Sequence, residues 1–222
     1  MENKINDEPI IETFYGKISP VDIAVLYSLM VKRISKGYSS SEMSFLMGYE
    51  NDVIGNIEQL NFKELTILEL YSYTNALEDD ALSGIILNDM GKEHDPADYQ
   101  IVKTTERILM HYEVFEILPD NTSRQLFHLF EVNPEHDRLK YNTSYSMGIE
   151  TATEILNTLL GGVLFQSPES PLDIFKRCRR ISTSIRPYYV QVALNNISQS
   201  KEYPKFKRIK TKKYGCLYEK AF

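Results

Sequence analysis

The segment that most constrains the fold is a helix followed at once by a glycine stop. Apolar side chains recur at three- and four-residue spacing and predict a helix over Asp22–Lys36. Gly37 suits the left-handed conformation in which many helices end. The chain must therefore reverse sharply after its first helix.

A second and a third helix are expected immediately after this reversal. Ser39 and Glu42 have the Ser-x-x-Glu spacing of a capping box, which predicts the start of a short helix. Gly48 closes that helix, and the pattern predicts a third helix over Asn51–Gln59. The N-terminal part of the chain is therefore expected to consist of short helices joined by tight turns.

Residues 19–78 resemble the lambda-repressor/Cro-like (XRE) helix-turn-helix family. The matching positions are Arg33, Gly37, Ser39, Met43, Ser44, Met47, Gly48, Ile54, Ile57 and Glu58, followed by Leu65, Leu70, Ala76 and Leu77. The resemblance implies a partly buried ion pair between Arg33 and Glu58, which joins the first helix to the third. It also implies that Ser44 is small so that two helices can approach closely.

In this family the third helix enters the major groove. The resemblance therefore implies DNA contacts by six residues, namely Ser39, Ser40, Asn51, Asp52, Val53 and Asn56. Asparagine can pair with adenine, and valine can touch a thymine methyl group. However, residues 20–78 carry 4 basic and 8 acidic residues, so this module alone neutralises phosphates poorly.

The positive charge of the chain is concentrated at its end. Residues 171–222 hold 13 Lys and Arg against 3 Asp and Glu, although the whole chain has a net charge of −6. The candidate phosphate contacts in this segment are Lys207, Arg208, Lys210, Lys212 and Lys213. Three interpretations stay open: the segment grips phosphates, in a winged-helix-like arrangement for example, it is a solvated face, or it docks on the acidic remainder of the chain.

The remaining sequence predicts a mixed domain. Period-two alternation over Arg107–Leu118 and Leu126–Val132, around turn residues 119–121, predicts a β-hairpin. Further helices are expected over 147–160, 170–180 and 187–197, and a small hairpin over 206–222. The expected fold class is α+β, arranged as an N-terminal segment (1–18), an all-helical module (19–78), an acidic linker (79–100) and a mixed α/β C-terminal domain (101–222).

No set of residues predicts catalysis, a metal site or a cofactor. The four histidines lack the spacing of a zinc-binding motif, and the acidic and histidine residues at 131–137 fall in an expected loop. Cys178 stands among arginines, which would favour a reactive thiolate, but we expect a structural cysteine. No stretch approaches the ~20 apolar residues of a membrane span.

These observations favour a sequence-specific transcriptional regulator that binds double-stranded DNA as a homodimer in the cytoplasm. The alternative is a protein-interaction or antitoxin-like module with a protein partner, which keeps the helix-turn-helix fold without reading DNA. Exposure of the Asn51–Asn56 helix, with positive charge nearby, would favour DNA binding.

Overall fold

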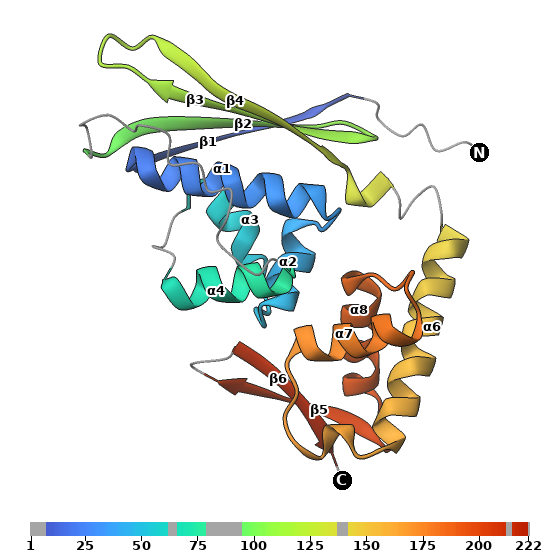
Figure 1. Ribbon diagram of the computed structural model, residues 1–222. Helices are drawn as coiled ribbons and strands as arrows, with labels where there is room; N and C mark the ends of the chain where they lie inside the picture. The colour runs from blue at the N-terminus through green and yellow to red at the C-terminus, as the bar shows by residue number, and fades with distance from the viewer. Residues whose placement is uncertain (1–7, 62–65, 79–94, 137–141, 212–214, 222) are drawn as a thin grey trace. The chain divides into compact units, whose positions relative to one another are not determined.

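A computed structural model of the chain describes residues 8–61, 66–78, 95–136, 142–211 and 215–221 (Figure 1). The fold is mixed α+β, with antiparallel sheets. The chain forms two compact units, and each unit is assembled from separate stretches of sequence. Unit 1 comprises residues 1–37, 55–65 and 81–140, and unit 2 comprises residues 38–54, 66–80 and 141–222. Residues 19–78 contribute to both units, and the domain boundaries expected from the sequence remain a prediction.

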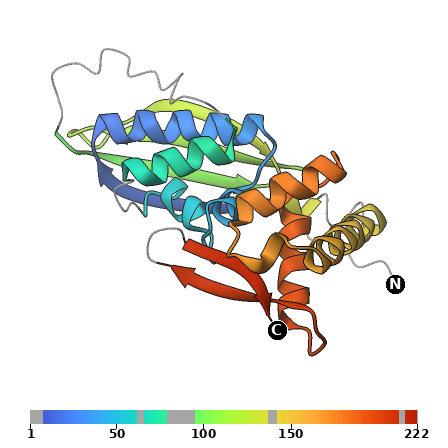
Figure 2. The same ribbon diagram turned by 60° about the horizontal axis from the view of Figure 1, so that its bottom comes forward.

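Unit 1 is a four-stranded antiparallel sheet with one long helix on it. The strands follow one another in chain order across the sheet, and helix α1 (Pro20–Ser35) lies along one face (Figures 1 and 2). The strands are β1 (Ile10–Ile18), β2 (Ala97–Thr105), β3 (Leu109–Ile117) and β4 (Ser123–Val132).

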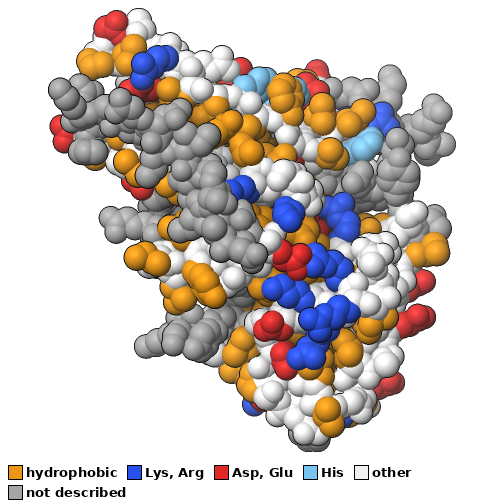
Figure 3. Space-filling view, in the orientation of Figure 1, with side chains coloured by type: hydrophobic (Ala, Val, Ile, Leu, Met, Phe, Trp, Pro, Cys, Tyr) orange, Lys and Arg blue, Asp and Glu red, His pale blue; other side chains and the backbone are white. Residues whose placement is uncertain are grey.

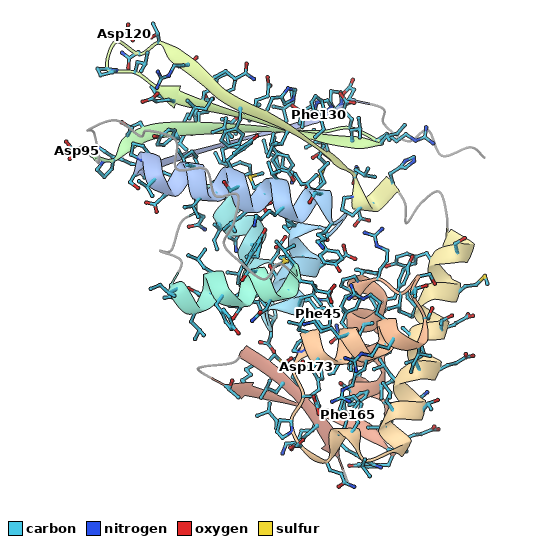
Figure 4. The ribbon with its side chains drawn as sticks, viewed as in Figure 1. Phe45, Asp95, Asp120, Phe130, Phe165 and Asp173 are labelled. Carbon is cyan, nitrogen blue, oxygen red and sulfur yellow. The ribbon has the colours of Figure 1, made fainter. Side chains whose placement is uncertain are left out.

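Alternation along the strands sends every second side chain toward α1. Ile101, Met110 and Val114 are buried on this inner face, and the Tyr27 ring of α1 lies 4.7 Å from the Phe127 ring of β4. On the outer face Phe130 is 51% exposed and points away from α1 (Figure 4). The core of unit 1 therefore lies between the sheet and α1.

Unit 2 contains helices and a small hairpin. Its elements are α2 (Ser40–Leu46), α4 (Ile67–Ala76), α6 (Asn142–Gly161), a 3-10 turn (Leu164–Gln166), α7 (Pro171–Ile181), α8 (Pro187–Gln199), β5 (Lys205–Thr211) and β6 (Gly215–Ala221). Helix α3 (Val53–Glu58) begins in unit 2 and continues into unit 1.

Aromatic side chains hold the hairpin of unit 2 to its helices. Phe165 of the 3-10 turn packs edge-to-face on Phe206 of β5, with ring centroids 4.6 Å apart, and Phe206 also contacts Tyr218 of β6. All three side chains are at most 4% exposed. Burial of aromatic rings of this size dominates the energetics of small cores, so these contacts fix the hairpin within unit 2.

The predicted helices and both predicted hairpins are confirmed, with boundaries that shift by a few residues. The prediction was incomplete for the segment 1–18, because Ile10–Ile18 forms β1, and for the linker 79–100, because β2 begins at Ala97. Residues 79–94 lie outside the described residues. The first four residues of the edge strand β1 are all exposed, so its sequence lacks the sustained apolar alternation that marks a half-buried strand.

Candidate nucleic-acid interface

The first element of the candidate interface is the turn that leads into α2. The hydroxyl of Ser39 accepts a hydrogen bond from the amide of Glu42 at 3.1 Å, and the Glu42 carboxylate accepts one from the amide of Ser39 at 2.9 Å. The predicted capping box is therefore confirmed. Glu42 is only 2% exposed, and it also accepts from Arg186 and from the amide of Tyr188 at 3.3 Å each. This carboxylate thus ties the start of α2 to the start of α8.

Asp52 connects α2 to the beginning of α3. Its carboxylate accepts hydrogen bonds from the hydroxyls of Ser40 at 2.7 Å and Ser44 at 3.1 Å. The Ser44 hydroxyl in turn accepts from the amide of Ile54 at 2.9 Å, which satisfies a free donor at the start of α3. Ser40 and Asp52 therefore form intramolecular hydrogen bonds, and Ser44 caps a helix in addition to being small.

Two asparagines of the predicted site remain available to a ligand. Asn51 and Asn56 are exposed, and their side chains have no hydrogen-bond partner among the described residues. Val53 is half-buried at the first position of α3. A carboxamide offers one acceptor and two donors, which is the pattern needed to read a base edge. Asn56 belongs to unit 1, and Asn51 belongs to unit 2.

The β5–β6 hairpin sits on the turn between α2 and α3. The amide of Cys216 donates a hydrogen bond to the carbonyl of Gly48 at 2.8 Å. Gly215 has a φ of +66°, and a Cβ atom there would lie 2.5 Å from the Gly48 carbonyl oxygen. Only glycine allows this approach, so Gly215 permits the hairpin to dock.

Docking brings the basic residues of β5 to the residue that precedes Asn51. Arg208 lies 3.3 Å from the carboxylate of Glu50, and Lys210 forms an ion pair with the same carboxylate. The hydrogen bond from Lys210 and the charges of both cations lower the pKa of Glu50. Lys207 pairs with Glu219 of β6 at 3.3 Å. Lys212 and Lys213 lie outside the described residues.

The predicted ion pair between Arg33 and Glu58 is confirmed, with Nε of Arg33 2.7 Å from the carboxylate. A third member of this ion cluster was not predicted. Glu131 of β4 accepts from Nη1 of Arg33 at 2.7 Å and from the Tyr112 hydroxyl at 3.2 Å. Arg33 is fully buried; burial lowers its pKa, but the two carboxylates outweigh this and raise the pKa above its usual value.

A signal for Glu131 was present in the sequence. Residues 127, 129 and 131 share one face of the predicted strand, and a carboxylate on an inward face requires a buried partner. Glu131 binds Arg33 rather than belonging to the acidic and histidine cluster at 131–137. Within the described ranges, no group of three or more His, Cys, Asp and Glu residues is arranged to hold a metal ion.

His111 and His128 lie in strands, and Cys178 lies in a helix. His111 and His128 lie on neighbouring strands, with their rings stacked 5.7 Å apart, as expected for strand residues. Cys178 is fully buried in α7, and burial raises the pKa of its thiol to about 12. At neutral pH the thiol is therefore protonated, which supports the structural interpretation.

Searches against protein families, curated proteins and solved structures find no match to this chain. No helix in the described part of the chain combines the length and the apolar character that crossing a membrane requires. The resemblance to the XRE family therefore depends on the residues of its motif.

Proposed function

We propose that this protein binds double-stranded DNA through the α2-turn-α3 segment and the adjacent basic strand β5, and that it acts as a sequence-specific transcriptional regulator. One observation carries the proposal: the hairpin docks on Gly48 and places Arg208 and Lys210 beside Glu50, directly before Asn51. In this proposal the chain functions as a homodimer, as the XRE family resemblance implies.

The α2-turn-α3 segment and strand β5 would contribute to DNA binding in different ways. Phosphate neutralisation by cations provides most of the affinity of such proteins for DNA, but it carries no direct sequence information. The helix-turn-helix segment is acidic, so the exposed cations Lys207, Arg208 and Lys210 of β5 would contact the backbone. Asn51 and Asn56 would read base edges, preferentially adenine.

Replacing Asn56 by alanine is expected to relax base preference without loss of stability. A bidentate asparagine–adenine pair contributes about 1–3 kcal/mol of discrimination at one base pair. Alanine is at least as favourable as asparagine in an exposed helix position, so the melting temperature should not fall. Selection of bound sequences from a random duplex pool measures the preference. Asn157→Ala, at an exposed position of α6, is the matched control. An unchanged consensus for Asn56→Ala would remove this residue from the reading site.

Glu50 is expected to compete with DNA phosphates for Arg208 and Lys210. Replacing Glu50 by glutamine should therefore raise DNA affinity by about three- to five-fold at low salt, similarly for all sequences. Fluorescence anisotropy with a labelled duplex measures this change. Glu12→Gln is the matched control, since Glu12 is an exposed carboxylate paired with Lys103 at 3.4 Å in unit 1. Equal affinity for Glu50→Gln and the control would show that these cations do not bind phosphate.

A second candidate function is a protein-interaction module. It is favoured by the exposed apolar side chains of the sheet in unit 1, including Ile11 (64%), Tyr15 (70%) and Val132 (54%). Exposed apolar patches often mark protein contacts. Substitutions of the β5 cations distinguish the two functions: they should weaken DNA binding, but they should leave binding of a protein partner at the sheet unchanged.

A further inference from the structure

A second basic surface lies on α7, a helix that contains none of the residues assigned to DNA reading. Lys176, Arg179 and Arg180 occupy successive turns of this helix, and with Glu78 and Thr183 they line a cavity of about 380 Å³ in unit 2. Figure 3 shows Lys and Arg side chains gathering over α7, with acidic side chains between some of them. The lining contains three cations and one carboxylate, so the cavity carries a net positive charge.

Arg179 is held in place on one side of this cavity. Its guanidinium forms an ion pair with Glu78. The guanidinium carbon also lies 5.4 Å from the centre of the Phe175 ring. A guanidinium fixed by several contacts loses little conformational entropy when it binds a ligand.

Lys176 and Arg180 have no carboxylate partner among the residues that the structure describes. Cations near the end of a helix are stabilised by the helix dipole, but their N–H donors remain free for an anion. Lys176 is half-buried and Arg180 is exposed, so both are accessible to a ligand in the cavity. The hydroxyl of Thr183 adds an uncharged donor.

From this geometry we infer that the α7 cavity binds a phosphate group. A terminal phosphate carries about −1.5 to −2 charges at neutral pH and has three acceptor oxygens, which matches two free cations, one fixed guanidinium and a hydroxyl. The phosphate would come from a small phosphorylated molecule or from the DNA backbone. This inference does not depend on the proposed function, because a phosphorylated ligand can bind whether or not the protein reads DNA.

Isothermal titration with inorganic pyrophosphate tests the inference on the full chain. We expect saturable binding at one site per chain, weakened about ten-fold or more by Lys176→Gln combined with Arg180→Gln. The matched control combines Lys201→Gln with Arg107→Gln, which removes one Lys and one Arg from exposed positions outside the cavity. Absence of saturable binding, or equal weakening by both double variants, would overturn the inference. Lys176→Gln alone should give a smaller loss, and thermal melting checks that each variant is folded.

Competition with duplex DNA identifies the source of the phosphate. If DNA displaces pyrophosphate and the α7 double variant binds all duplexes more weakly than the control does, the site contacts the DNA backbone. If DNA leaves pyrophosphate binding unchanged, the site takes a small phosphorylated molecule. If the protein binds pyrophosphate but no duplex, the proposed function fails and the phosphate site remains.

Discussion

Replacement of Arg33 by methionine is expected to lower the free energy of unfolding by about 3–5 kcal/mol. Methionine fills much of the same space with an uncharged, unbranched side chain, but it leaves the carboxylates of Glu58 and Glu131 without their cation. These residues are 4% and 8% exposed, so their charges are poorly solvated. Removing one partner of a buried ion pair costs this much because the remaining charge stays buried. With two carboxylates on one guanidinium, the upper part of the range is expected.

Urea unfolding followed by circular dichroism measures this effect. Arg107→Met is the matched control: Arg107 is exposed, and its replacement should change stability by no more than about 0.5 kcal/mol. Replacing Arg33 by methionine together with Glu58 and Glu131 by leucine should restore much of the stability, because apolar replacement of a whole buried ion cluster is often neutral or stabilising. A loss below about 1 kcal/mol for Arg33→Met alone would contradict the buried arrangement.

The second large effect concerns DNA binding. Replacing Lys207, Arg208 and Lys210 together by glutamine is expected to flatten the slope of log affinity against log salt by about 2–3 units, since each neutralised phosphate contributes about 0.9. Affinity should fall about equally for all duplexes, because backbone contacts carry no direct sequence information. Anisotropy titrations at several salt concentrations measure the slope.

A matched variant removes the same charge elsewhere. Lys17, Lys36 and Arg107 are exposed residues of unit 1, and replacing them by glutamine also removes two Lys and one Arg. The rival interpretation is that the β5 cations only hold the hairpin in place through Glu50 and Glu219. In that case the β5 variant would melt at a clearly lower temperature, and its salt slope would equal that of the matched variant. Under the DNA-binding proposal, we expect only a small change in the melting temperature of the β5 variant, because exposed ion pairs contribute about 0–1 kcal/mol each.

Much of the local structure was predictable from the sequence. The capping box at Ser39 depends only on Glu42, three positions later. Gly48 has a φ of +84° and ends the second helix, as its position in the sequence predicted. The terminal hairpin likewise follows from alternation around a short turn. The predicted Arg33–Glu58 pair spans 25 residues, but it came from a family pattern rather than from local chemistry.

The candidate site was predicted only in part. Asn51 and Asn56 are exposed, as a base-reading role requires, whereas Asp52 forms hydrogen bonds within the chain that no spacing rule indicated. Docking of the basic segment on the acidic part of the chain was one of the interpretations left open, but its contact with Gly48 was not predicted. It depends on a close backbone approach at Gly215, and a glycine in a turn looks the same in the sequence whether or not another segment packs against it.

The sequence by itself determined the short-range features: where helices start and stop, which strands form hairpins, and where positive charge is concentrated. These features depend on residues only a few positions apart, whose preferences act before any tertiary contact forms. The tertiary structure alone decided which distant segments meet. Ile10–Ile18 becomes a strand because β2 pairs with it, and Glu131 can be buried because Arg33, 98 residues away, neutralises it. A strand edge or a buried charge is stable only when its partner is present, and the partner is not specified by the neighbouring sequence.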